Sequence, residues 1–200
     1  MNQKKADKFL QKGIVLFDKD QIPDACTQFE KGVRLNQKDY RLHLWLAKCM
    51  AEFGSFENAL VEFDNAIKLK PGNVQSHFEK GDTLALLGCF DEAIDEMNKA
   101  IELNPRNADY HYFKGLVHTS MKDYEKALME FDSSLELLPD SSEFHQAKTE
   151  ALIQLGRTTE ALEEQNKVHT MTEDFERHPL RYEGALEIRR GYFFQKLDEK

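Results

Sequence analysis

The sequence predicts an all-α protein in which one helix–turn–helix unit is repeated along the chain to form a solenoid. Three observations predict this fold. Three prolines lie 34 residues apart, at Pro71, Pro105 and Pro139, and helix-capping and turn residues recur in phase with them. A ladder of five alanines keeps the same spacing; it consists of Ala25, Ala59, Ala93, Ala127 and Ala161. Several ladders with one period indicate a true repeat.

Each unit is predicted to contain two helices. In the unit that starts at Asn73, this residue is a good N-cap for a first helix over 74–87, and Gly88 ends that helix. A second amphipathic helix over 90–103 follows, and Pro105 closes the unit. The caps recur as Asp39, Asn73, Asn107 and Ser141, and the turn glycines as Gly54, Gly88 and Gly156, with Lys122 in their place once.

Two further ladders predict how the helices pack. The small-residue ladder is Gly13, Ala47, Gly81, Gly115 and Thr149, and the large-residue ladder is Phe29, Phe63, Met97 and Phe131. We expect the small residues where the two helices of a unit cross closely, because a larger side chain would separate them. The large residues should fill the space against the next unit, so that stacking completes the core.

The repeat divides the chain into five predicted units and a C-terminal segment. The units are 6–39, 40–73, 74–107, 108–141 and 142–175. Residues 176–200 fall outside the pattern, and residues 177–200 carry six Lys or Arg against four Asp or Glu. We expect this segment to form a helix that caps the last unit. The alternative is a partner-binding helix in which Tyr192 and Phe193 are anchors.

Composition and charge exclude several classes of protein. The 200 residues are 40% hydrophobic and 32% charged, which is typical of a soluble folded chain. A net charge of −9 makes nucleic acid and anionic membranes poor partners. The three cysteines lack CxxC spacing and are expected to be reduced. Without a signal peptide or an apolar run long enough to cross a bilayer, we expect a cytoplasmic or otherwise intracellular protein.

Candidate catalytic and metal-binding residues are few. The histidine ladder His43, His77, His111 and His145 places its rungs about 10 Å or more apart, too far for one ion to be shared. These histidines are therefore expected to pack at the edge of the core, and to make stability acid-sensitive if they are buried in the neutral form. Neither a nucleophile arrangement nor a glycine-rich phosphate loop is present. We expect no metal, no cofactor and no enzymatic activity.

The unit pattern resembles the tetratricopeptide repeat family. The residues that carry the resemblance in one unit are His77, Gly81, Leu84, Ala93, Met97, Ala100 and Pro105, and the neighbouring units match in phase. The usual tryptophan of the first helix is Phe9 or histidine here, and Gln37 stands where proline is expected. The fifth unit departs at Thr149, Gln165 and Glu173. The resemblance implies a right-handed superhelix whose members generally bind other proteins in a concave groove lined by the first helices.

In phase with that groove lies a stripe of aromatic and charged residues. The candidate partner-binding residues are Arg41, Leu44, Trp45, Lys48, Phe78, Glu79, Asp82, Asp109, Tyr112, Phe113 and Leu116. Aromatic anchors surrounded by acids favour a basic or amphipathic partner segment. The alternative is that Leu44, Phe78 and Tyr112 only pack between adjacent first helices. Trp45 and Phe113 are turned further from the packing stripe.

The chain lacks the cationic clamp with which some members of the family hold the acidic tails of chaperones. The corresponding positions carry aliphatic, aromatic and acidic side chains, and the single lysine, Lys48, falls where asparagine is needed. The leading hypothesis is therefore a non-catalytic scaffold or adaptor that binds a different kind of protein segment. The alternative is a structural subunit built permanently into a larger assembly through its convex face or C-terminal helix. Self-association is a variant of that alternative.

Overall fold

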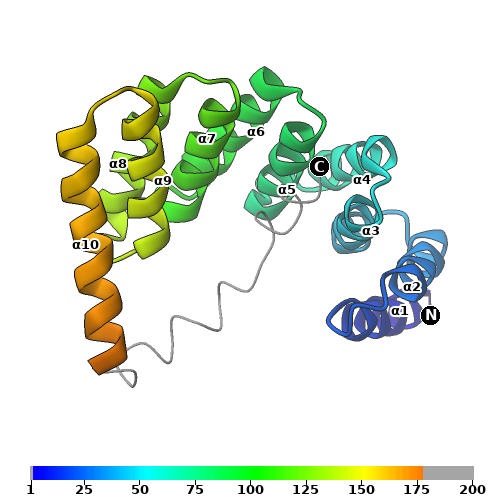
Figure 1. Cartoon of the computed structure of the whole chain (residues 1–200). Helices are drawn as coiled ribbons and strands as arrows, with labels where there is room; N and C mark the ends of the chain where they lie inside the picture. Colours follow the sequence, from blue (N-terminus) through cyan, green and yellow to red (C-terminus); the bar gives the residue numbers. More distant parts are fainter. Residues whose placement is uncertain (1, 178–200) are drawn as a thin grey trace.

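The computed structural model describes residues 2–177, which form ten α-helices (Figure 1). The helices are α1 (Asn2–Phe17), α2 (Ile22–Leu35), α3 (Tyr40–Glu52), α4 (Phe56–Leu69), α5 (Val74–Leu86), α6 (Phe90–Leu103), α7 (Ala108–Ser120), α8 (Tyr124–Leu137), α9 (Ser142–Gln154) and α10 (Thr158–Arg177). The predicted all-α fold is confirmed. The C-terminal anchors proposed from the sequence, Tyr192 and Phe193, lie outside the described residues.

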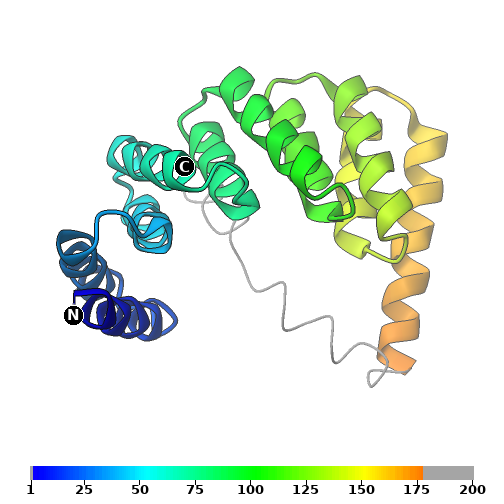
Figure 2. The same ribbon diagram turned by 180° about the vertical axis from the view of Figure 1, so that it is seen from behind.

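The helices form five hairpins that stack along an arc, as Figures 1 and 2 show from opposite sides. Each odd-numbered helix packs against its own partner, and the second helix of each hairpin packs against the first helix of the next. Successive odd-numbered helices also contact one another, whereas within residues 2–177 successive even-numbered helices do not. The closer spacing of the odd-numbered helices places them on the inner, concave side of the arc.

The predicted N-caps are confirmed at the start of four first helices. The side chains of Asp39, Asn73, Asn107 and Ser141 each accept a hydrogen bond from a backbone N–H in the first turn. In α5, for example, the Ser76 N–H donates to Asn73 Oδ1 over 2.9 Å. Such a cap satisfies an N–H that has no partner within the helix, so the repeated cap fixes where each hairpin begins.

The turn inside each hairpin requires a left-handed backbone. Gly54, Gly88 and Gly156 have φ values of 80°, 79° and 72°, and Lys122 has a φ of 61° at the equivalent place. In this region a Cβ crowds the following carbonyl oxygen, which costs a non-glycine residue about 1–2 kcal/mol. The fourth hairpin therefore contains a strained residue where three others contain glycine.

We expect Lys122→Gly to raise the free energy of unfolding by about 0.5–1 kcal/mol. Removal of the Cβ relieves the left-handed strain, and the greater freedom of glycine in the unfolded chain offsets part of the gain. Urea denaturation measures the change. The reverse substitution, Gly88→Lys, is the matched control and should lower stability by a similar amount. An unchanged or lower stability of Lys122→Gly would show that the turn at Lys122 is not strained.

The core contains a column of large side chains, which pack against small residues. Phe29, Phe63 and Phe131 are at most 1% exposed, and Met97 takes the same place in the third hairpin. A Cβ added to Gly115 would lie 2.5 Å from the Phe131 ring, and one added to Gly13 would collide with the Phe29 ring. The small-residue ladder is therefore required by close helix crossing, as predicted. Within residues 2–177, no helix combines the length and apolar character needed to cross a membrane.

Candidate functional site

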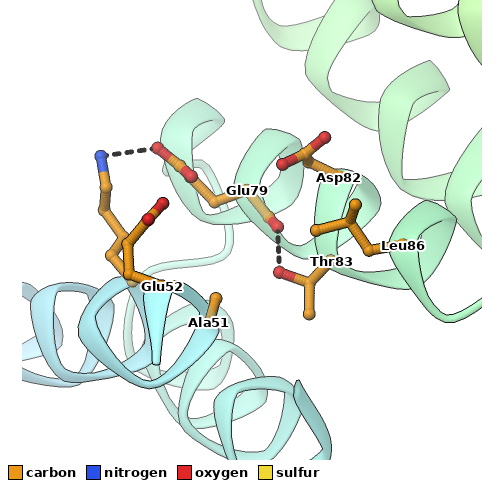
Figure 3. A pocket seen from close by; sticks show the side chains of 7 residues that line it. Ala51, Glu52, Glu79, Asp82, Thr83 and Leu86 are labelled. Atoms are coloured by element: carbon orange, nitrogen blue, oxygen red, sulfur yellow. Dashed lines mark hydrogen bonds and ion pairs between the residues drawn. The ribbon is translucent and has the colours of Figure 1, made fainter. Parts of the chain in front are cut away.

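A small pocket opens on the concave side between α3 and α5 (Figure 3). It is lined by Lys48, Ala51, Glu52, Glu79, Asp82, Thr83 and Leu86. Its volume of about 20 Å³ accommodates the tip of one side chain rather than a drug-sized ligand. Three predicted groove residues, Lys48, Glu79 and Asp82, meet here.

The pocket is predominantly acidic. Lys48 Nζ lies 2.7 Å from Glu79 Oε1, so the single cation of the pocket is paired across the two helices. Glu52 on α3 and Asp82 on α5 add two further carboxylates (Figure 3). The Thr83 hydroxyl donates to the Glu79 carbonyl oxygen over 2.8 Å. With three carboxylates and one lysine, the pocket favours a cationic group.

The predicted anchor Trp45 is half-buried between the first two hairpins. Its ring lies 5.5 Å from the Phe17 ring, edge-on, and 5.8 Å from the Phe29 ring, nearly parallel to it. Lys48 Nζ is placed over the indole at 5.1 Å. The Trp45 ring therefore contributes to packing between the first two hairpins and is only partly exposed at the N-terminal end of the groove.

The aromatic residues of α5 and α7 form a second cluster. Phe78 contacts Tyr110 and Phe113, with ring centroids 5.1 Å and 5.0 Å away. Phe78 and Phe113 are half-buried, whereas Tyr112 is only 2% exposed and stacks on Phe144. Tyr112 thus packs between helices and does not face a partner.

The remaining predicted groove residues are divided between core and surface. Leu44 is buried in the core of the second hairpin, and Leu116 is half-buried against the core of the fourth. Arg41 binds Asp7 over 2.8 Å and Asp39 over 2.7 Å, which links α1 to the start of α3. This guanidinium holds the pKa of Asp39 below its usual value. Asp109 is half-buried in the first turn of α7.

Each ladder histidine pairs with a glutamate on the second helix of its hairpin, a feature that sequence reasoning missed. The pairs are His43–Glu62, His77–Glu96, His111–Glu130 and His145–Glu164, with Nδ1–Oε2 distances of 2.5, 2.6, 2.8 and 2.5 Å. The glutamates are themselves 34 residues apart and 19 residues after each histidine. That second ladder is the signal from which the pairs could have been predicted.

Lysines complete this polar network in the last three hairpins. Lys80, Lys114 and Lys148 lie 3.1, 2.7 and 3.0 Å from the glutamates of their own hairpins. Lys80 and Lys148 also bind Asp64 and Asp132 of the preceding hairpin, each over 2.7 Å. The network therefore connects neighbouring hairpins. In the second hairpin Leu46 occupies the position of the lysine.

The ladder histidines were expected to make stability acid-sensitive if they are buried in the neutral form, and His43 does not meet that condition. The hydrogen bond to Glu62 raises the pKa of His43 against the effect of burial, so the protonated form is favoured in the folded protein. The reason is the neighbouring carboxylate of Glu62, which sequence reasoning did not include. His118, which occupies a core position, has its pKa lowered by burial and by the charge of Lys114.

The ladder histidines already have partners on both ring nitrogens in three hairpins. The Nε2 atoms of His43, His77 and His145 lie 2.8–3.0 Å from backbone carbonyl oxygens. Within residues 2–177, no three His, Cys, Asp or Glu side chains converge to hold a metal ion. The network is thus built for stability between helices, and the concave pocket is the candidate for recognition.

A curved stack of helical hairpins with a polar concave groove defines a repeat protein of the class that generally binds other proteins. Tetratricopeptide repeat models match residues 10–74 and 108–141, and a further model of the same repeat matches residues 81–122. The chain belongs to the tetratricopeptide repeat family. The family fold supports an interaction scaffold, and such folds are generally non-catalytic.

Solved structures of MamA have the same fold. "MamA 41-end from Desulfovibrio magneticus RS-1" is 19% identical, with a TM-score of 0.78 over 85% of this chain and 96% of that one. A structure titled "Crystal structure of MamA" is 22% identical, with a TM-score of 0.76 over 82% of this chain and 96% of the other. At this identity the likeness shows the fold alone. No curated protein matches the sequence.

Proposed function

We propose that this protein is a non-catalytic adaptor whose concave groove binds a basic or amphipathic segment of a partner protein. The observation that carries the proposal is the acidic pocket between α3 and α5, where three carboxylates meet one lysine. A lysine or arginine side chain of the partner would enter this pocket. Its apolar neighbours would lie against the accessible sides of Trp45, Phe78 and Phe113.

The size and position of the pocket support this mode of binding. A pocket of about 20 Å³ suits one cationic tip, and the half-buried aromatic residues lie on the same inner helices, α3, α5 and α7. Half-buried acids and half-buried rings on the same surface supply charge complementarity and anchoring area together. The borders of the five predicted units and of the C-terminal segment 176–200 are the positions at which we propose to truncate the chain.

The test is a display library of short peptides selected on the full-length chain. We expect selection to enrich peptides in which one lysine or arginine is flanked by apolar residues. Combined Glu52→Gln and Asp82→Asn should weaken a selected peptide roughly tenfold, because two attractive charges are lost at a partly screened site. The affinity should also fall as salt is raised. Fluorescence anisotropy measures both effects.

The matched control is Glu57→Gln with Asp91→Asn, which changes the net charge equally at exposed positions outside the pocket. It should leave the affinity unchanged. Enrichment of acidic peptides, or equal losses in both double variants, would contradict the proposal. The charge variants test binding more directly than Phe78→Ala with Phe113→Ala, because the two rings also pack α5 against α7 and their removal would disturb the fold.

The alternative, a structural subunit that assembles through its convex face, is favoured by a different observation. A cavity of about 290 Å³ lies between α8, α9 and α10, and it is lined partly by Leu128, Met129 and Leu152. Met129 lies at the edge of this cavity and is 69% exposed. If this face anchors an assembly, Met129→Lys should abolish co-purification of near-stoichiometric partners while the groove variants retain it.

A further inference from the structure

The structure brings two cysteines together that are 23 positions apart in the sequence. Cys26 lies in the first turns of α2, and Cys49 lies near the end of α3. Cys49 is fully buried in the core shared by the first two hairpins, and Cys26 packs against that core from a half-buried position. The repeat does not predict this contact, because the two residues occupy different phases.

The Cys49 thiol reaches α2 one helical turn before Cys26. It donates to the Ile22 carbonyl oxygen over 3.2 Å, and Cys26 packs against the cluster of buried side chains that contains Cys49. The backbone N–H of Cys26 also faces the Cys49 sulfur. Because Ile22 lies one helical turn before Cys26 and α2 packs against α3, the Cys49 sulfur lies beside Cys26, an arrangement from which a disulfide can form with little movement.

The environments of the two sulfurs differ in the way that a reactive pair requires. Interaction with the Cys49 side chain lowers the pKa of Cys26, whereas interaction with Cys26 and burial raise the pKa of Cys49. The half-buried thiol of Cys26 is therefore the more nucleophilic of the two, and the buried thiol of Cys49 is the one that lies beside it.

We propose that Cys26 and Cys49 form a peroxide-sensitive thiol pair that closes to a disulfide and links the first hairpin to the second. The Cys26 thiolate attacks one oxygen of hydrogen peroxide, the O–O bond breaks, and the departing hydroxide takes up a proton as water. The Cys49 sulfur then attacks the Cys26 sulfenic acid. The S–O bond breaks, the S–S bond forms, and the hydroxide leaves as water with the Cys49 proton.

The link would act at the N-terminal end of the concave groove. Trp45 lies one helical turn before Cys49 on α3 and contacts Phe29 on α2, so it spans the junction that the disulfide would fix. It is also the single tryptophan of the chain. Its fluorescence therefore reports on this junction alone. Closure should change its emission and raise the melting temperature of the first two hairpins.

The test uses the full-length protein treated with a small excess of hydrogen peroxide and analysed without reduction. We expect a mass loss of about 2 Da and a tryptic cross-link between Cys26 and Cys49, separable because lysines and arginines lie between them. Cys89→Ser should behave like the wild type. Cys26→Ser should show no such loss, and Cys49→Ser should stop at a sulfenic acid on Cys26, about 16 Da heavier, that dimedone traps.

Three results would overturn the proposal. The first is oxygen addition at Cys26 while Cys49 remains a free thiol in the wild type. The second is a cross-link that includes Cys89. The third is two unreacted thiols under conditions that oxidise Cys89, which is half-buried at the start of α6 and serves as the internal reference.

Discussion

Phe131→Ala is expected to lower the free energy of unfolding by about 3–5 kcal/mol, as substitution of a fully buried phenylalanine commonly does. Phe131 is 1% exposed, lies 5.9 Å from the Tyr112 ring, and belongs to the core shared by the last two hairpins. Its removal leaves a cavity under Gly115 that the closely crossed helices cannot fill. Urea denaturation followed by circular dichroism measures the loss.

Met129→Ala, two residues earlier on α8, is the matched control. Its side chain is 69% exposed, so the change should stay within about 0.5 kcal/mol. Comparable losses in the two variants would contradict the assignment of Phe131 as the packing residue of this hairpin.

A double-mutant cycle with Gly115→Ala tests why glycine is present. The added methyl has no room beside the Phe131 ring, so neighbouring atoms must shift. We expect the free energy of unfolding to fall by about 1 kcal/mol after the gain in helix propensity is subtracted. In the Phe131→Ala background the same methyl should instead stabilise by about 1 kcal/mol, because it fills part of the cavity. An effect of Gly115→Ala that is the same in both backgrounds would show that the ring does not impose the glycine.

Glu164→Gln is expected to lower the stability of the last hairpin by about 2–3 kcal/mol at neutral pH. Burial opposes ionisation of Glu164, but hydrogen bonds from Lys167, Lys148 and His145 outweigh it and lower its pKa to about 2, against a usual value of 4.5. The folded state therefore binds fewer protons than the unfolded state between these two pH values. The stabilisation is complete above pH 4.5 and is lost as the pH falls through about 2.

Hydrogen exchange of the α9 and α10 amides measures this effect locally, since a terminal hairpin of a solenoid can open separately. The difference between wild type and Glu164→Gln should be constant above about pH 5 and should shrink as the pH is lowered toward 2. Glu163→Gln changes the same charge at the adjacent exposed position and should have little effect. A difference that persists unchanged at pH 2 would exclude the charge of Glu164 as its cause.

Much of the fold could be predicted because residues of the same type recur every 34 positions in the sequence. The caps at Asp39 and Asn73 and the turn glycines at Gly54 and Gly88 act within a few residues of their own position. Such local interactions depend on residue type and spacing alone. The close helix crossing at Gly115 was predicted because small residues recur at a constant separation, but its contact with Phe131 of the same hairpin came from the structure.

The candidate site was predicted less completely. The stripe placed Lys48, Glu79 and Asp82 on the inner helices, and these residues do line one pocket. It left open whether Leu44 and Tyr112 face a partner or pack between helices, and the structure buries both, because exposure on an inner helix depends on how closely the next hairpin approaches.

The sequence by itself determined the helical hairpin, its period, its caps and turns, and the membership of the chain in a protein-binding repeat family. Only the tertiary structure decided which charges meet across hairpins, as Lys148 meets Asp132, and which cysteines pack into one core, as Cys26 and Cys49 do. The physical reason is the range of the interactions. A period fixes what happens within a unit, whereas contacts between units depend on the rotation and distance that side-chain packing imposes on each successive hairpin.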